Sequence, residues 1–496
     1  MSAYKTLESR WHHISNIGHA LSILSWDEAT MMPSGGGEAR AKASAGLRFI
    51  RHEMIIQKDT NDLISKAKEQ KDLNDWEISN LKLIEKNWRR AQCIPSDLVR
   101  RSSEASSRCE QAWRKQRAEN NWKEHLPLLE EVLKTQLEAA KILSQNLELD
   151  PYDALLDQYE AGLKSSEIDV LFGELRSQLP SILDAAILKQ SDFKIQEPKI
   201  MISPQKQETL GRHLMKLFLF DFEHGRLDVS HHPFCGGVPD DVRLTTRYDE
   251  KNFISAVMGV LHETGHARYE QNLPKAWRDQ PVGDALGMSV HESQSLFIEM
   301  QICRSREFLK FLRPLLLKFF DLDSKDPTWS EENLYHLYNK IERGYIRVDA
   351  DELTYPLHIL LRYEIERDLI QGKLKLKDLP ELWNEKMQSY LGLSTQENFK
   401  DGCMQDIHWP YGLFGYFPCY TLGAMMAAQW AEAIKEAIPN LSSQIESGSS
   451  EDLQNWLRKN IHEKGSLFSA PELIQQVTGK KLSSGSFIQH LKTRYL

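Results

Sequence analysis

The chain has 496 residues, of which 41% are hydrophobic and 27% are charged, so it can bury a large core like an ordinary globular protein. Its formal net charge of -9 gives no basic excess for binding nucleic acid or an anionic membrane surface, and both classes of partner are excluded. No apolar run reaches the roughly 18 residues that a membrane-spanning helix needs.

The cysteines and the N-terminus indicate the cellular compartment. Six cysteines are scattered along the chain without a CxxC pair, whereas a disulfide framework is dense and typical of small secreted domains. The opening stretch MSAYKTLESRWHH has no apolar core, so we expect no secretory signal. We therefore predict a cytoplasmic protein with free thiols.

Helical periodicity dominates the first 200 residues or so. Apolar residues recur at intervals of three and four in WEISNLKLIEKNWRRA (76–91) and in HLPLLEEVLKTQLEAAKILSQNL (125–147), which predicts two amphipathic helices. Between helices, MMPSGGGE (31–38) combines proline with glycines and predicts a loop.

The stretch HHPFCGGVPDDVRLTTRYDE (231–250) has a different pattern. A Gly-Gly turn precedes VRLTTRY, whose β-branched residues and alternation predict a small β-hairpin. Helical patterns return from 252 to the end, and we find no internal repeat or linker. The sequence thus predicts one mostly α domain over 1–496 in two lobes, with an N-terminal helical region at about 1–200 and a metal- and substrate-binding region at about 231–430.

The predicted helix FISAVMGVLHETGHARYE (253–270) carries an HExxH motif. His262 and His266 are four residues apart, so both imidazoles lie on one helical face and can bind one cation. Glu263 projects to one side, where it can contact a water on that cation. Two histidine ligands and a glutamate general base are the arrangement of a zinc peptidase.

The alternative is a chance HExxH, since the chain has 17 histidines. Gly259 and Gly265 each weaken a helix by about 1 kcal/mol relative to alanine. Because this cost occurs twice beside the histidines, we expect something to approach the backbone closely there, and we favour a metal site.

A catalytic zinc needs a third protein ligand and one open position. The metzincin pattern requires Gly at 269 and His at 272, where this chain has Tyr and Asn, so that class is excluded. A glutamate on a following helix is the other common solution, and GMSVHESQSLFIEM (287–300) offers Glu292 as the first choice. Glu299 stays open by spacing, and Glu270 is nearer but poorly directed.

HETGH (262–266) followed by HESQS (291–295) is a rarer pair than HExxH alone, and the pair resembles the Taq-type metallocarboxypeptidases, peptidase family M32. The resemblance extends over nearly the whole chain. Its further motifs, in the order of the family, are WDEATMMP (26–33) with Arg40, PYDALLDQYEAG (151–162), HPF (232–234), DVRLT (241–245), IRVDADELTY (346–355), GCMQDIHW (402–409) and YGLFGYFPCYTLG (411–423).

The resemblance implies a two-lobed helical fold around a deep groove, similar to neurolysin and angiotensin-converting enzyme. It implies removal of single residues from peptide C-termini, zinc or cobalt as the cofactor, and a homodimer. Carried over to this chain, His262, His266 and Glu292 are the metal ligands and Glu263 is the base.

A carboxypeptidase must bind a free terminal carboxylate, and a guanidinium does so with two hydrogen bonds. We predict Arg347 for this role, because it lies in a family motif after a helical segment. The alternative is a structural ion pair with one of three nearby acids, Asp349, Asp351 and Glu352. Arg243 in DVRLT is a second candidate clamp, or else a residue that only fixes the hairpin with Asp241 and Thr245.

The oxyanion of the tetrahedral intermediate needs a donor besides the metal. His408 and Tyr420 are our candidates, because the pair is similar to the His and Tyr that close over the scissile carbonyl in the converting enzyme. We expect Gln405 and Asp406 to orient a ligand histidine, since bound imidazoles usually donate their other N–H to a carboxylate or carbonyl. The acid that thermolysin places after its third ligand is missing, because Leu296 occupies that position.

The predicted function is a cytoplasmic metallocarboxypeptidase acting on peptides with a free C-terminus. One rival is a neurolysin-like endopeptidase with the same site. Another is a non-catalytic helical scaffold with a structural metal, against which Glu263 argues, because a structural site prefers four protein ligands and needs no base.

Overall fold

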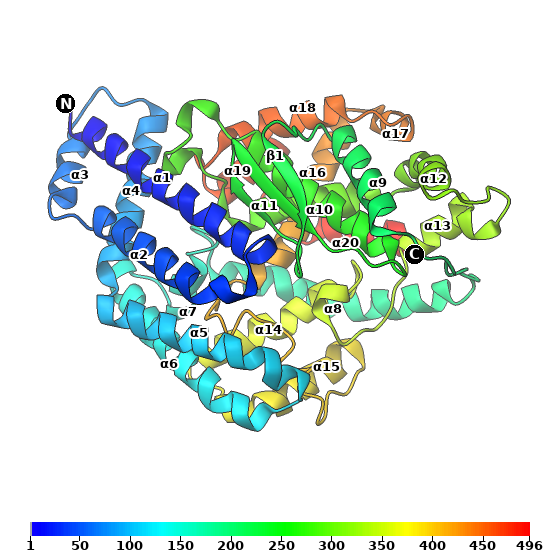
Figure 1. Ribbon diagram of the computed structural model, residues 1–496, viewed down its shortest axis with the longest axis horizontal. Helices are drawn as coiled ribbons and strands as arrows, with labels where there is room; N and C mark the ends of the chain where they lie inside the picture. The colour runs from blue at the N-terminus through cyan, green and yellow to red at the C-terminus, as the bar shows by residue number, and fades with distance from the viewer. Residues whose placement is uncertain (1) are drawn as a thin grey trace.

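The computed structural model describes residues 2–496, and within them the chain is mainly helical (Figure 1). The two predicted amphipathic helices are confirmed as α4 (Asp75–Cys93) and α6 (Trp122–Leu147). The predicted break is also confirmed, although Ser34–Gly36 forms a 3-10 turn and α2 already begins at Gly37. Among the described residues, none of the helices combines the length and the apolar character of a membrane span.

The helices build two halves, as predicted for a mostly α, two-lobed protein. One half holds the core of α5 (Ser96–Ala118), α6, α7 (Pro151–Leu156), α8 (Ser165–Gln190), α14 (Tyr355–Ile370), α15 (Leu379–Leu391) and α20 (Gly485–Tyr495). The other holds that of α9 (Pro204–Leu217), α10 (Phe253–Gln271), α11 (Gly287–Leu296), α12 (Arg306–Phe320), α13 (Glu331–Tyr338), α17 (Leu441–Glu446), α18 (Glu451–Asn460) and α19 (Ala470–Thr478).

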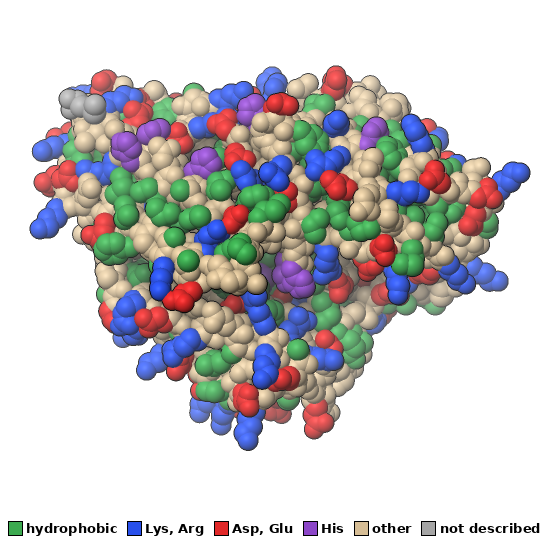
Figure 2. All heavy atoms as spheres, in the orientation of Figure 1, with side chains coloured by type: hydrophobic (Ala, Val, Ile, Leu, Met, Phe, Trp, Pro, Cys, Tyr) green, Lys and Arg blue, Asp and Glu red, His purple; other side chains and the backbone are tan. Residues whose placement is uncertain are grey.

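One helix joins the two cores. Within α16 (Pro418–Ala437), Leu422 and Met425 pack into the first core, while Met426 and Trp430 pack into the second. The N-terminal helices α1 (Ala3–Thr30), α2 (Gly37–Ile55), α3 (Thr60–Lys68) and α4 form a smaller cluster beside them. Figure 2 shows the surface hollowed near its middle, with lysine and arginine side chains around the hollow.

A three-stranded sheet covers α10. The predicted hairpin is confirmed as β2 (Cys235–Val238) antiparallel to β3 (Asp241–Thr246), but the predicted Gly-Gly turn is wrong. Gly236 and Gly237 lie inside β2, opposite Arg243 and Val242, and the turn is formed by Pro239 and Asp240. A third strand, β1 (Gly225–Val229), was not predicted; it pairs parallel to β3 and gives the order β1-β3-β2. The strands β1 and β2 therefore form the two edges of the sheet.

The prediction of helices from 252 to the end is wrong for two long segments, residues 339–354 and residues 392–417. Residues 392–417, between α15 and α16, run through turns held by local backbone bonds, such as Leu413 N–H to the His408 carbonyl at 2.8 Å. The segment 392–417 carries GCMQDIHW. Its turns can direct these side chains toward one region, whereas in a helix they would point in all directions around the axis.

Candidate metal centre

The two helices α10 and α11 bring together the predicted ligands. His262, His266 and Glu292 can each offer one ligand atom so that all three atoms lie within 4.8 Å of one another. The Nε2 atom of His266 is 3.4 Å from an Oε of Glu292. Two imidazoles and one carboxylate at this separation match the donor set of a catalytic divalent ion with an open coordination position.

A glycine sets the distance between these two helices. A Cβ at Gly265 would lie 2.5 Å from the Gln294 carbonyl oxygen and 2.6 Å from the Ser295 Cα, so any larger residue would push α11 and its glutamate ligand away. The expected close approach is therefore confirmed at Gly265. At Gly259 no described atom lies within 4 Å of such a Cβ, and packing gives no reason for that glycine.

Both ligand histidines are held through Nδ1, which leaves Nε2 for the ion. The Nδ1 of His262 lies 3.0 Å from a carboxylate oxygen of Glu299, and Arg304 donates to the other oxygen at 2.7 Å. The Nδ1 of His266 lies 3.1 Å from the His291 carbonyl oxygen and 2.7 Å from Nδ1 of the His291 ring. A partner on the far nitrogen fixes the tautomer and the ring orientation of a metal-binding histidine.

The residues left open as ligands by spacing therefore have other partners. Glu299 contacts His262 and Arg304; although burial opposes ionisation, those two neighbours lower the pKa of its carboxyl to about 2. Glu270 lies 2.8 Å from Nε2 of His291, whose ring lies against His266. Sequence reasoning missed Glu299 as a partner because it lies in a π-helix, Phe297–Cys303, which breaks the angular step of an α-helix.

The environment of Glu263 fits a general base that binds a water or a substrate proton. The residue is buried, and its Oε2 has no hydrogen-bond partner among the described residues. Burial raises the pKa of its carboxyl to about 7, against the opposing charge of His262. A buried carboxylate oxygen without a donor is costly unless a water or substrate proton fills the place.

The structure also brings together the two predicted oxyanion donors. Nε2 of His408 lies 3.1 Å from the Tyr420 hydroxyl. One turn later on α16, a Cβ at Gly423 would lie 2.8 Å from the Glu292 Cβ, so α16 packs directly on the ligand helix. Burial, followed by the neighbouring Tyr416 hydroxyl, raises the pKa of Tyr420 well above its usual value, and the charge of Glu292 adds to this effect, so the phenol stays protonated beside the ligand.

Arg347 lies next to His408 and Tyr420 and pairs with an acid that is distant in the sequence. Its Nε donates to Asp406 at 2.9 Å and its Nη1 to the Tyr355 hydroxyl at 2.8 Å, while the Tyr420 ring lies 5.1 Å from the guanidinium carbon. The alternative in which Arg347 forms an ion pair with Asp349, Asp351 or Glu352 is therefore wrong. Asp351 instead caps the turn before α14, and Glu352 pairs with His490 and Arg494.

Gln405 and Asp406 do not orient a ligand histidine, and that expectation is wrong. Gln405 accepts from the Arg347 backbone N–H at 2.8 Å. Asp406 is shared, because Arg362 donates to it at 2.7 Å from the other side. Arg362 is fully buried, and a charge inside the apolar run LHILLRYEI was the signal that could have revealed a buried ion pair.

Arg243 lies on β3 in contact with the N-terminal helix. Its guanidinium binds both carboxylate oxygens of Asp241, at 2.9 and 2.8 Å, and lies 4.2 Å from the Trp26 ring. Thr245 accepts from the Phe234 backbone N–H at 3.0 Å. The motifs DVRLT, HPF and WDEATMMP thus meet at one place and fix the hairpin against α1.

Comparison with known proteins agrees with this geometry. The family model described as carboxypeptidase Taq (M32) metallopeptidase matches residues 6–495. The chain is 33% identical to thermostable carboxypeptidase 1 of Pyrococcus furiosus over 99% of this chain and 98% of that protein, and 35% identical to thermostable carboxypeptidase 1 of Thermus thermophilus over 100% and 98%.

Solved structures give the same result. Metallocarboxypeptidase 1 of Trypanosoma cruzi superposes with a TM-score of 0.97 at 40% identity, covering 99% of both chains. The M32 carboxypeptidase of Deinococcus radiodurans superposes with a TM-score of 0.92 at 31% identity, covering 99% of this chain and 98% of that one.

Proposed function

We propose roles for the site residues from the premise that this chain belongs to the carboxypeptidase Taq (M32) metallopeptidase family and is a metal-dependent carboxypeptidase. The named relatives that match the whole chain are carboxypeptidases, which leaves the endopeptidase and scaffold alternatives without support. The observation that carries our assignment is the convergence of three ligand atoms beside the unpartnered carboxylate of Glu263.

We propose that His262, His266 and Glu292 hold the ion, and that the ion is zinc, with cobalt as the alternative. The donor set supports zinc, since imidazole nitrogens and a carboxylate are its usual catalytic ligands. A bound divalent ion supplies Lewis-acid chemistry: it polarises the scissile carbonyl and lowers the pKa of water to about 7.

Glu263 acts as the general base in this proposal. Its free oxygen accepts a proton from the attacking water, and the same carboxyl then delivers that proton to the leaving amine. Burial raises the pKa of this carboxyl above its ordinary value, which suits both steps, because a base and acid catalyst works best when its pKa is near the working pH.

Tyr420 donates to the developing oxyanion, and His408 orients it. The Nδ1 of His408 is buried and makes no hydrogen bond, because the nearest carboxylate oxygen, from Asp406, is 3.9 Å away. Burial, followed by the charge of Arg347, lowers the pKa of the ring to about 3. The neutral ring therefore carries its proton on Nε2, because a buried N–H without an acceptor costs more than a buried lone pair. Nε2–H then donates to the Tyr420 oxygen, which leaves the phenol proton free for substrate.

Arg347 binds the terminal carboxylate in our proposal. Arg347 and Arg362 share the single charge of Asp406, so one positive charge of the three groups is left over. A substrate carboxylate neutralises that excess, whereas a C-terminal amide does not. Arg243 stays the second candidate clamp: Asp241 engages its Nε and Nη2, and Nη1 is free among the described residues.

The test uses an unblocked peptide and its C-terminally amidated twin with metal-loaded protein, and reads products by mass spectrometry. We expect stepwise loss of single residues from the free-acid peptide alone. Replacement of Arg347 by Gln should raise KM for that peptide by roughly 10- to 100-fold. The control Arg343→Gln, which loses an exposed ion pair with Asp184 and a hydrogen bond to the Leu391 carbonyl, should not. Internal cuts in both peptides would contradict the proposal.

We further propose that residues 1–496 form one catalytic domain, that the chain acts as a homodimer in the cytoplasm, and that neither nucleic acid nor membrane is a partner. The dimer follows from the family resemblance, and light scattering after gel filtration tests it. All six cysteines are free, which supports a reducing compartment.

A further inference from the structure

The ligand helix α11 has no capping residue of its own. Leu286 precedes its first turn, and in the described part of the chain this leucine gives no side-chain cap. Helices often begin at a serine, threonine, aspartate or asparagine, whose side-chain oxygen accepts from one of the first free backbone N–H groups. The start of α11 therefore depends on acceptors from other segments.

Two residues of the turn after α7 supply these acceptors. The Tyr159 carbonyl accepts from the Met288 N–H at 2.7 Å, and Oε2 of Glu160 accepts from the Ser289 N–H at 2.8 Å. A carboxylate at a helix N-terminus also interacts favourably with the helix dipole. Glu160 is buried, and it thus caps α11 although it lies 129 residues before Ser289 in the chain.

Gly287 makes room for this carboxylate. A Cβ at this position would lie 2.8 Å from Oε2 and 3.1 Å from Cδ of Glu160. The φ angle of Gly287 is +56°, a conformation that favours glycine. The first residue of α11 is therefore fitted to Glu160 both in space and in backbone conformation.

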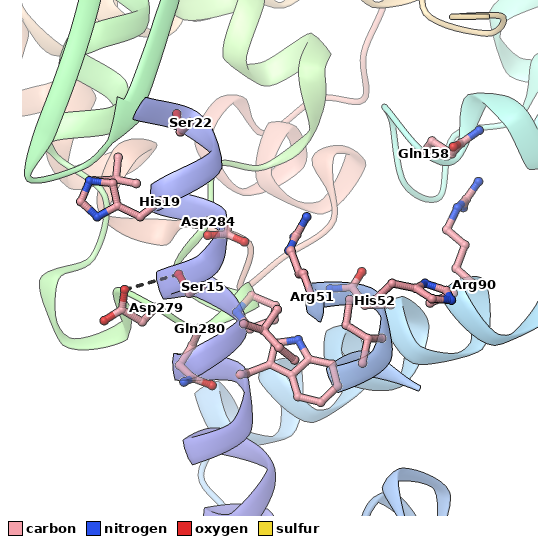
Figure 3. A pocket seen from close by; sticks show the side chains of 18 of the residues that line it. Ser15, His19, Ser22, Arg51, His52, Arg90, Gln158, Asp279, Gln280 and Asp284 are labelled. Atoms are coloured by element: carbon pink, nitrogen blue, oxygen red, sulfur yellow. Dashed lines mark hydrogen bonds between the residues drawn. The ribbon is translucent and has the colours of Figure 1, made fainter. Parts of the chain in front are cut away.

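The turn that carries Glu160 is fixed to the first half of the molecule. It follows α7, whose buried side chains belong to the first core, and the Glu160 N–H donates to the Leu156 carbonyl at 2.9 Å. Asp157 accepts from Arg90 of α4 at 2.8 Å. Figure 3 shows Arg90 extending from α4 toward the turn at Gln158. Because this turn is held at several points, it gives α11 a fixed support.

The helix α11 belongs to the second half of the molecule and carries the ligand Glu292. Its buried side chains lie in the second core, and the Tyr269 hydroxyl of α10 accepts from the Leu286 N–H at 2.9 Å. Ser289 and Glu292 are three residues apart, so they lie on one helical face about one turn from each other. A displaced first turn would therefore move the carboxylate that lies beside His266.

We propose that Glu160 is a positioning residue of the metal centre. It caps α11 from the other half of the molecule and so holds the Glu292 carboxylate beside the two ligand histidines, without touching the ion itself. The inference rests on the proposed function, because it takes Glu292 as a metal ligand.

The acceptor oxygen of Glu160 matters more in this role than its charge. Burial raises the pKa of the carboxyl to about 7, although the hydrogen bond from Ser289 opposes this shift. Part of the carboxyl is therefore neutral near pH 7, and an amide oxygen at the same reach can replace it.

The experiment measures the Kd for Zn²⁺ by competition with a chelator and the free energy of unfolding in urea. Glu160→Ala should raise the Kd by about 5- to 30-fold, the equivalent of one lost helix cap. Glu160→Gln should keep it within about twofold of the wild type, because it keeps the acceptor. Gly287→Ala displaces the carboxylate while Glu160 is intact; it should also raise the Kd, and it replaces Glu160→Ala as the test if that variant does not fold.

Asp153→Ala is the matched control. Asp153 is a buried carboxylate seven residues before Glu160, and its Oδ1 accepts from the Ser165 N–H at 2.8 Å at the start of α8, which carries no ligand. Its loss should lower the free energy of unfolding and leave the Kd for Zn²⁺ unchanged.

A wild-type Kd in Glu160→Ala, or an equal rise of the Kd in Asp153→Ala, would overturn the role of Glu160 and leave the proposed function intact. Glu292→Gln tests the premise and should bind Zn²⁺ much more weakly than the wild type. If it bound Zn²⁺ as tightly as the wild type, the ligand assignment would fail, and the role of Glu160 with it.

Discussion

Replacement of Glu299 by Gln tests how the metal centre is held. The change keeps the side-chain length but removes the charge that faces Nδ1 of His262 at 3.0 Å. Loss of such a partner typically weakens metal binding by about 10- to 100-fold, or about 1.4–2.7 kcal/mol. It also leaves the guanidinium of Arg304, now 2.7 Å from Glu299, without its carboxylate, which should cost about 3–5 kcal/mol of folding free energy because the pair is buried.

Two assays separate these effects: competition with a chelator gives the metal Kd, and urea denaturation gives the free energy of unfolding. Glu270→Gln is the control, because Glu270 reaches the ligands only through His291 and should change the metal Kd less. An unchanged metal Kd in Glu299→Gln would refute the orienting role. Complete loss of metal at saturating concentration would mean that Glu299 is itself a ligand.

Three further changes have defined outcomes. Tyr420→Phe should lower kcat by about 10²- to 10³-fold with metal content unchanged; an unaltered kcat would remove Tyr420 from the oxyanion site. Burial raises the pKa of Glu366 from 4.5 to about 7, so its contribution to stability is full below pH 4.5 and is lost as pH rises to 7. Relative to Glu366→Gln, the wild type should lose about 3 kcal/mol of unfolding free energy over that range, and a constant difference in urea titrations would contradict this. Gly423→Ala should cost about 1–3 kcal/mol and weaken metal binding, because its Cβ would collide with Glu292. Gly46→Ala, in open space on α2, is the control and should be neutral or stabilising when both variants are compared by urea titration.

The parts of the site that could be predicted from sequence are those with short spacing or a rare motif. His262 and His266 are one helical turn apart, so helix geometry alone puts them together. Glu292 required the second motif, because nothing in the spacing shows that α11 lies against α10. The glycine at 265 was the local sign of that contact, since its cost to the helix needs a packing reason.

The parts that could not be predicted depend on contacts between distant segments. Asp406 joins Arg347 and Arg362 across loops whose course no local pattern fixes. The strand β1 carries GRLDV, which has too little alternation to distinguish it from a loop, and only its pairing with β3 makes it a strand. The same holds for Glu299, because the direction of its side chain depends on a π-helix that no sequence pattern indicates.

The most direct test of the central claim measures metal content and turnover on one preparation of Glu263→Gln. If His262, His266 and Glu292 alone hold the ion and Glu263 moves the proton, the variant should keep one equivalent of metal per chain and lose turnover. A variant that loses its metal, or one that still releases C-terminal residues at the wild-type rate, would contradict the account.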